Sequence, residues 1–252
     1  MKEILLITAH PDDEIIWFGS TIYELNKLED INISIICLWG ILEPPGSMQS
    51  VMPGYKDIDR KEQFNEVCKS MGIKKYFAIT DVDSHVYKGI NQTYNNILHE
   101  FKKTIKKINI KNIDMIITHS NYGDEHKHNG HTITNEFSKI YCKNNNIPFS
   151  FFSILQLPQI NHISILKNTY RKNQLHVLNY SKCSNDMFYI QFQGNLTIKI
   201  ELFNLYKAVD VQAHINNIFG CTTISEGLYF SKEAKPIIDF ILSKINKISN
   251  VF

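Results

Sequence analysis

The sequence predicts an α/β protein with a doubly wound, mostly parallel sheet flanked by helices. Short apolar runs that suit buried strands alternate with longer segments in which apolar residues recur at helical spacing. Polar segments rich in histidine and carboxylates follow directly after two of those runs, at residues 10–14 and 119–131. Open parallel sheets place functional groups at such strand ends, so both observations agree on one architecture.

The first two strands and the helix between them are the clearest elements. Residues 4–8 predict a buried first strand, and residues 31–38 predict a second. One helical stripe between them carries most of the apolar side chains, namely Ile15, Ile16, Phe18, Ile22, Leu25 and Leu28. Pro11 suits the opening turn of this helix, because the backbone N–H that proline lacks has no helical partner there.

The following elements continue the alternation, after a loop rich in proline and glycine at 43–54. Helices are expected at about 57–71 and 97–108, and strands at 76–80 and 114–118. A further helix is expected from Asn129, which can cap it. Its buried stripe holds Ile133, Phe137, Ile140 and Tyr141.

The second half of the chain is less regular. Strands are expected at 149–155, 187–193 and 196–202, and helices at about 203–216 and 231–246. The polar stretch at 156–185 is open to three interpretations, namely an insertion, a lid or an antiparallel edge. We expect a single domain over residues 1–252, with a motif-bearing core at about 1–145 and a variable part at about 146–252.

Composition and charge argue against several classes of protein. The 252 residues are 43% hydrophobic. The chain has 27 Lys and Arg and 25 Asp and Glu, which gives a net charge of +2. This charge suggests neither nucleic acid nor an anionic membrane as a partner. Five cysteines without a C-x-x-C pair predict reduced thiols. No apolar run reaches the roughly 18 residues that a membrane span requires, and no secretory signal is expected. We expect a cytoplasmic protein, and the sequence leaves its oligomeric state open.

The most informative motif is His10-Pro11-Asp12-Asp13-Glu14, directly after the first predicted strand. An imidazole followed three residues later by a carboxylate makes His10 and Asp13 two ligands for a borderline-soft cation. Asp12, between them, is left over to handle protons. The alternative is an N-capping turn with acids near the helix dipole, but such a turn needs neither a histidine nor three successive acids.

A histidine-rich segment follows the predicted strand that ends at Thr118. His128 lies at the mouth of the next helix and His131 in its first turn, so both can point into one cleft. His119 and His126 have the weaker case as ligands, and a supporting or exposed position is preferred for them. A polar surface loop is the alternative interpretation of the whole segment.

Together the two motifs predict a catalytic zinc site. A catalytic zinc keeps three protein ligands and one open position for water, and His10, Asp13 and His131 supply the three. The metal lowers the pKa of its water toward ~7, which makes Asp12 the candidate general base. A protonated His128 would stabilise the oxygen anion that forms when hydroxide adds to an amide carbonyl. Iron(II) suits the same donor set.

These residues carry a family resemblance. Ala9-His10-Pro11-Asp12-Asp13-Glu14, with Thr118-His119 and His128-Asn129-Gly130-His131, resembles the LmbE-like, or PIG-L, family of metal-dependent N-deacetylases over residues 1 to about 140. Its members deacetylate N-acetylglucosamine-bearing substrates, including glycosylphosphatidylinositol, mycothiol and bacillithiol precursors and aminoglycoside intermediates. The resemblance implies a Rossmann-like fold and the same ligands, base and oxyanion partner.

Other positions match the family less closely. Arg60 and Asp83 resemble its substrate-binding residues, which implies that both contact a sugar. Leu38-Trp39-Gly40 stands where the family has Thr-x-Gly, and its C-terminal Lys…Ser-Gln element is at best Lys207…Val211-Gln212. The acceptor pocket is therefore expected to differ from those of characterised relatives. Trp17 and Trp39 are interpreted as packing residues, with a place in the cleft wall as the alternative for Trp39.

Three functions are compatible with these features. The leading prediction is a hydrolase that removes an N-acetyl group from a small-molecule or glycan-linked amino sugar of the N-acetylglucosamine type. The second is a catalytically silent metal- or sugar-binding protein on the same scaffold. The third is a nucleotide-dependent α/β transferase or reductase, which is weakened because no G-x-G-x-x-G motif follows the first strand.

Overall fold

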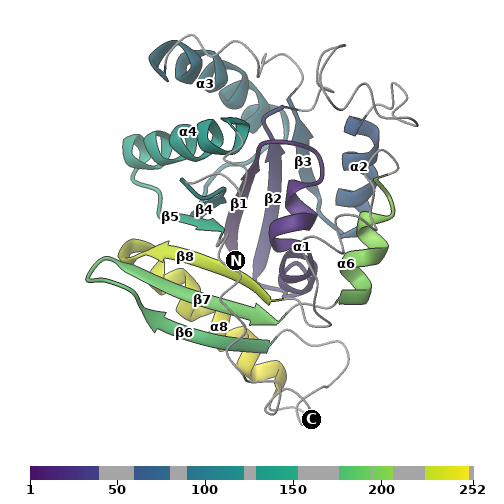
Figure 1. Ribbon diagram of the computed structural model, residues 1–252, viewed down its shortest axis with the longest axis vertical. Helices are drawn as coiled ribbons and strands as arrows, with labels where there is room; N and C mark the ends of the chain where they lie inside the picture. The colour runs from purple at the N-terminus through teal and green to yellow at the C-terminus, as the bar shows by residue number, and fades with distance from the viewer. Residues whose placement is uncertain are drawn as a thin grey trace.

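The computed structural model describes residues 1–39, 60–79, 90–121, 129–152, 176–193, 196–206 and 225–249, and the structural statements below concern these ranges. Helices flank both sides of one mixed sheet (Figure 1). The strands are β1 (Lys2–Thr8), β2 (Ile31–Cys37), β3 (Lys75–Ala78), β4 (Met115–Thr118), β5 (Phe149–Phe152), β6 (His176–Lys182), β7 (Met187–Gln193) and β8 (Ser225–Ser231). The helices are α1 (Asp13–Leu25), α2 (Arg60–Ser70), α3 (Ile90–Lys107), α4 (Asn129–Asn145), α6 (Leu196–Phe203), the short 3-10 helix η2 (Lys232–Ala234) and α8 (Lys235–Ser249).

The strand order of the sheet is β3-β2-β1-β4-β5-β8-β7-β6. Strands β1 to β5 run parallel, and β8, β7 and β6 extend the sheet in antiparallel fashion. The chain moves from β1 toward one edge and from β4 toward the other, so the order reverses between these two central strands. Ligands of open α/β sheets bind outside the carboxyl ends of the strands at such a reversal. The predicted α/β class with a mostly parallel sheet is confirmed.

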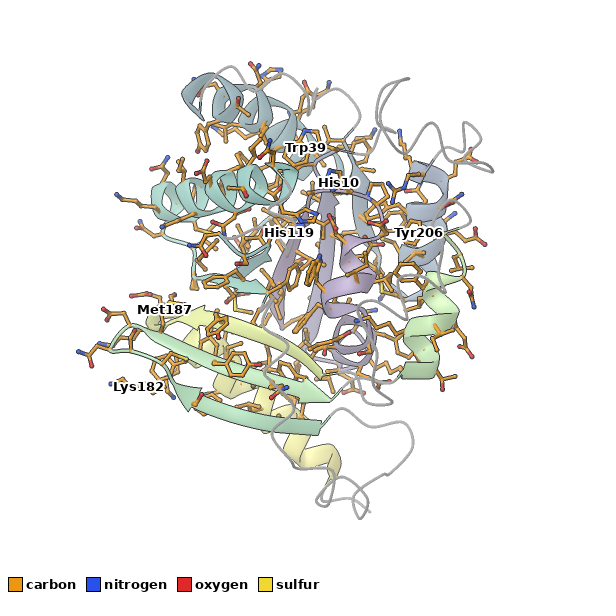
Figure 2. The ribbon with its side chains drawn as sticks, in the orientation of Figure 1. His10, Trp39, His119, Lys182, Met187 and Tyr206 are labelled. Carbon is orange, nitrogen blue, oxygen red and sulfur yellow. The ribbon has the colours of Figure 1, made fainter. Side chains whose placement is uncertain are left out.

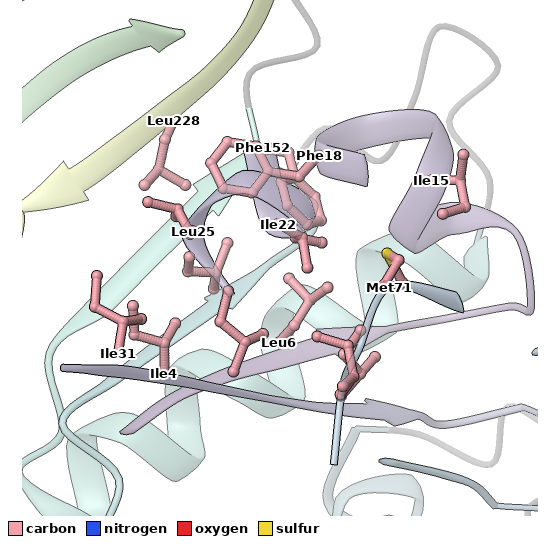
Figure 3. Packing of buried hydrophobic residues seen from close by; sticks show 14 of the residues in the cluster. Ile4, Leu6, Ile15, Phe18, Ile22, Leu25, Ile31, Met71, Phe152 and Leu228 are labelled. Atoms are coloured by element: carbon pink, nitrogen blue, oxygen red, sulfur yellow. The ribbon is translucent and has the colours of Figure 1, made fainter. Parts of the chain in front are cut away.

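Two apolar clusters cover the sheet, because successive side chains of a strand point to opposite faces. Ile4 and Leu6 of β1 join the cluster that contains residues of α1, α2, α6 and α8 (Figure 3). Leu5 and Ile7 join the cluster that packs against α3 and α4. β1 is therefore buried on both faces, which explains why it reads as a continuous apolar run rather than an alternating one.

Helix α1 is interrupted at Phe18, whose φ of −148° and ψ of 16° are not helical. A break exposes backbone groups that have no partner within the helix. Glu226 of β8 accepts hydrogen bonds from the freed N–H groups of Ser20, at 3.2 Å, and Thr21, at 2.8 Å. A carboxylate at the start of a helical segment also complements its dipole. The second part of α1 is thus capped by a distant strand.

Lys199 of α6 completes this arrangement from the other side of the break. Its Nζ atom donates to the carbonyl of Ile16, at 2.7 Å, and to Glu226, at 2.9 Å. Both charged side chains are buried, and burial lowers the pKa of Lys199 while the attraction of Glu226 raises it. Elements α6 and β8 therefore hold the helix that begins in the His-Pro-Asp-Asp-Glu motif.

The structure corrects the prediction for residues 196–202. We expected a strand there, but the segment belongs to helix α6. Its buried side includes Lys199 together with Leu202 and Phe203, which lie three and four residues further on. The helical stripe was hidden because one of its buried positions is a charged residue.

The rest of the C-terminal part agrees more closely with expectation. β7 and α8 lie where a strand and a helix were predicted, and β6 shows that residues 176–182 of the polar stretch form an antiparallel edge. β8 was not predicted. Residues 153–155 of one expected strand and 207–216 of one expected helix lie outside the described part. Among the described helices, none combines the length and apolar character needed to cross a membrane.

Candidate functional site

The carboxyl ends of β1 and β4 bring the two sequence motifs side by side. The strands pair in parallel register, with Ile4 opposite Met115 and Leu6 opposite Ile117. The chain segments that leave them therefore emerge at the same edge of the sheet. Figure 2 shows His10 and His119 close together there, with Trp39 near them. This is the reversal point at which the topology favours a ligand site.

The three expected metal ligands converge at this edge. One ligand atom from each of His10, Asp13 and His131 can be chosen so that all lie within 4.8 Å of one another. His131 Nε2 lies 3.1 Å from Asp13 Oδ1, and His10 Nδ1 lies 3.5 Å from Asp13 Oδ2. Ligands about 2.0–2.2 Å from a tetrahedral zinc are separated by roughly 3.4 Å, so these residues fit a divalent ion. His131 comes from the first turn of α4, as predicted.

A hydrogen bond within the protein holds the Asp13 carboxylate in place. Its Oδ2 atom accepts a hydrogen bond of 2.6 Å from the backbone N–H of His10, which closes the turn between the two ligands. Burial alone raises the pKa of Asp13, but the imidazoles of His131 and His119 outweigh it and keep this pKa well below its usual range. The carboxylate is therefore ionised at neutral pH and ready to bind a cation.

His119 lies behind the ligands rather than among them. Its Nε2 atom accepts a hydrogen bond of 3.0 Å from the N–H of Ala9 and lies 3.2 Å from Asp13 Oδ2. Its ring stacks on that of His131 with centroids 4.2 Å apart and planes 4° apart. Burial, and then the neighbouring His131, lower the pKa of His119 to about 4. His119 therefore contacts Asp13 and His131, two of the candidate ligands, and the backbone of Ala9.

Asp12 has an unusual backbone conformation. It directly precedes Asp13, one of the three candidate ligands His10, Asp13 and His131, which are called the triad below. Its φ of 112° and ψ of −28° are left-handed, a conformation that non-glycine residues rarely adopt. Its carboxylate pairs with the guanidinium of Arg60, which also donates to the carbonyl of Pro11 at 2.6 Å. Arg60 is buried in the first turn of α2. A sugar contact by Arg60, implied by the resemblance, stays a prediction.

Two further buried residues, Glu14 and Tyr206, contact this turn, and neither was assigned a role from the sequence. Glu14 accepts hydrogen bonds from the N–H of Asp12, at 3.2 Å, and from the hydroxyl of Tyr206. Burial raises the pKa of Glu14 to about 8, against the lowering effect of the Tyr206 hydrogen bond. Burial also raises the pKa of Tyr206 well above its ordinary value. Glu14 belongs to the motif, but no sequence signal pointed to Tyr206.

Two tryptophans border the candidate ligands. The ring of Trp39 stacks on His10 with centroids 6.0 Å apart, and the ring of Trp17 meets His131 edge-on at 6.4 Å. Trp39 is buried, which agrees with its interpretation as a packing residue. Apolar walls of this kind exclude water from the ligands and strengthen electrostatic interactions among them.

Several residues named from the sequence lie outside the described part of the chain. They are the proposed oxyanion partner His128, the proposed sugar contact Asp83, and His126, Lys207 and Gln212. Their roles stay predictions.

Comparisons with known proteins agree with this geometry. The family model for GlcNAc-PI de-N-acetylase, PIG-L, matches residues 5–142, more than half of the chain. The search of curated proteins found no match to this chain. A deacetylase of the teicoplanin biosynthesis pathway is 13% identical, with 91% of this chain and 98% of that chain covered and a TM-score of 0.61. The A40926 pseudoaglycone deacetylase is 13% identical, with 91% of this chain and 97% of that chain covered and a TM-score of 0.57. The N,N'-diacetylchitobiose deacetylase from Pyrococcus horikoshii is 15% identical, with 92% of this chain and 84% of that chain covered and a TM-score of 0.51.

The structural likenesses show a shared fold, and the family match spans β1 through most of α4. That range contains Asp12 and the three residues His10, Asp13 and His131, whose ligand atoms meet at one edge of the sheet. The chain therefore belongs to the PIG-L, or LmbE-like, family.

Proposed function

We propose that this protein is a metal-dependent hydrolase that removes the N-acetyl group of an amino sugar of the N-acetylglucosamine type. One observation carries the proposal: three ligand atoms converge, and Asp12, which precedes the ligand Asp13 in the chain, has a carboxylate that pairs with Arg60 and is not one of the three ligands. A metal site with a spare, oriented carboxylate suits hydrolysis. Family membership and the deacetylases that share the fold support the same reaction.

His10, Asp13 and His131 would hold the cation. One ionised carboxylate and two neutral imidazoles suit zinc, and iron(II) is the alternative ion. When bound, such a cation supplies Lewis-acid chemistry, which lowers the pKa of water and polarises an amide carbonyl. The low pKa of Asp13 serves this binding, since a protonated carboxyl would have to lose its proton first.

Asp12 is the proposed general base. It takes one proton from the attacking water, whose oxygen forms a new bond to the carbonyl carbon. As the C–N bond breaks, the same residue returns the proton to the amine, so that a free amino sugar leaves together with acetic acid, which ionises to acetate in water. Arg60 holds the Asp12 carboxylate during both transfers. His128 is the proposed donor to the developing oxyanion.

The decisive experiment combines metal analysis with a screen for released amine over N-acetylglucosamine conjugates. We expect stoichiometric divalent metal and turnover of at least one conjugate. Asp12→Asn should keep the metal while kcat falls by about 10²- to 10⁴-fold, the usual contribution of a general base. Asp186→Asn, an exposed aspartate in the β6–β7 turn, is the matched control and should resemble the wild type.

Two outcomes would contradict the proposal. Undiminished turnover in Asp12→Asn would remove this residue as the base. Stoichiometric metal without release of amine from any conjugate would favour a catalytically silent binding protein instead.

A further inference from the structure

The peptide group between Pro11 and Asp12 is held at both of its polar atoms. Its carbonyl oxygen accepts the hydrogen bond of 2.6 Å from Arg60, and its N–H donates to Glu14 at 3.2 Å. A left-handed non-glycine residue costs on the order of 1–3 kcal/mol and persists only where its surroundings impose it. These two contacts, together with the start of α1, impose the conformation of Asp12.

Glu14 can hold this peptide only if its own carboxyl group is fixed. One oxygen of the carboxyl faces the N–H of Asp12, and the other accepts the hydroxyl of Tyr206. Both side chains are fully buried, so neither hydrogen bond competes with bulk water. Tyr206 therefore determines which way the Glu14 carboxyl points.

Tyr206 is itself rigidly placed by the C-terminal part of the chain. It follows α6, where its N–H donates to the carbonyl of Phe203 at 2.9 Å, and its ring packs in the cluster that contains α1 and α2. Figure 2 shows it beside α1, on the side of α6 and α2. Tyr206 and Glu14 lie 192 positions apart in the sequence.

We infer that Tyr206 is a positioning residue for Asp12, acting through Glu14 and the Pro11–Asp12 peptide. The inference rests on the proposed function in one respect, that Asp12 is the base. Loss of the hydroxyl frees the Glu14 carboxyl to rotate, which releases the N–H of Asp12 and lets the base leave its productive orientation. Tyr206 touches neither the triad nor the reacting atoms in this scheme.

The test removes the single hydroxyl with Tyr206→Phe and compares it with Tyr141→Phe. Tyr141 is another buried tyrosine, which lies in α4 and packs against Phe101 of α3. For Tyr206→Phe we expect kcat to fall by about 10- to 100-fold, the size of effect that misplaced catalytic groups produce, with KM and metal content unchanged. Tyr141→Phe should change the melting temperature about as much as Tyr206→Phe does, but it should keep the wild-type kcat.

Two measurements separate positioning from packing. The double variant Tyr206→Phe with Glu14→Gln should lose no more kcat than the worse single variant, because both act through one contact. In ¹⁵N-labelled protein, the amide resonance of Asp12 should shift in Tyr206→Phe and stay in place in Tyr141→Phe. The amide measurement needs no turnover, so it tests the inference even if the wild type deacetylates nothing and the proposed function fails.

An unshifted Asp12 amide in Tyr206→Phe would overturn the inference. So would losses of kcat that multiply in the double variant, since independent effects on packing would then explain them.

Discussion

The two halves of the sheet contribute to the site in different ways. The parallel half, β1 to β5 with α1 to α4, supplies every candidate ligand and the proposed base, all at strand ends or in the first turn of a helix. From the antiparallel half and the helices around it, Lys199, Tyr206 and Glu226 make hydrogen bonds with α1. One half carries the chemistry, and the other fixes the helix that presents it.

The largest expected effect belongs to the parallel half. Asp13→Ala removes the carboxylate that both candidate histidine ligands face. Metal affinity should fall by more than the roughly 10- to 100-fold seen when only a supporting residue is lost. Turnover should disappear with the metal, and metal content after dialysis measures the effect directly. Retention of stoichiometric metal by Asp13→Ala would place the ion elsewhere.

The second effect concerns the antiparallel half and should appear in stability rather than in metal content. Lys199→Met leaves the charge of Glu226 buried without its cation, and breaking a buried ion pair this way costs about 3–5 kcal/mol. Urea unfolding followed by tryptophan fluorescence measures the loss. Lys69→Met, at an exposed lysine of α2, is the control.

A double variant tests whether the pair acts as a unit. Lys199→Met with Glu226→Gln removes both charges and should recover part of the lost stability. If the double variant is as unstable as the sum of the single variants, the ion pair does not explain the role of these residues.

The smallest effect is expected at the opposite edge of the sheet, where β1 and β4 begin. Asp114 accepts hydrogen bonds from Lys2, at 2.8 Å, and from the N–H of Glu3, at 2.9 Å. Burial alone raises its pKa, but these contacts outweigh it and hold the pKa below its ordinary value. Asp114→Asn should cost no more than about 1 kcal/mol at neutral pH, because the pair lies at the surface.

The sign of its pH dependence follows from that pKa. A carboxyl group with a depressed pKa stabilises the fold above its unfolded-state pKa of about 3.9 and loses that contribution as the pH falls through the folded-state value. Wild type and Asp114→Asn should therefore converge in stability as the pH falls below about 4. A difference that stayed constant would mean that the charge of Asp114 is not its source.

The parallel half could be predicted from sequence because its information is local. Continuous apolar runs identified β1 and β2, and the spacing of His10 and Asp13 identified two ligands on one turn. The approach of His131 required only that parallel strand ends share an edge. The strands, the helices and the candidate ligands of this half therefore lie close to where they were expected, except that α3 begins at Ile90 rather than near residue 97.

The antiparallel half was harder to predict, because contacts between residues far apart in the sequence determine its structure. Residues 196–202 of α6 were expected to form a strand, and contacts with Glu226 and with the carbonyl of Ile16 explain why Lys199 is buried there. Tyr206 is one tyrosine among 12 in the chain, and nothing near it in the sequence marks it as a partner of Glu14. Such pairs become visible only when the chain is folded.

The break in α1 has a consequence for how the protein matures. The contacts that Glu226 makes with Ser20 and Thr21 span more than 200 positions of the chain, 206 and 205 respectively. During synthesis the motif leaves the ribosome first, whereas the residue that caps the second part of α1 follows more than 200 positions later. Nascent chains that carry all the candidate ligands still lack this cap. The order of synthesis thus delays completion of the ligand-bearing helix until β8 has joined the sheet.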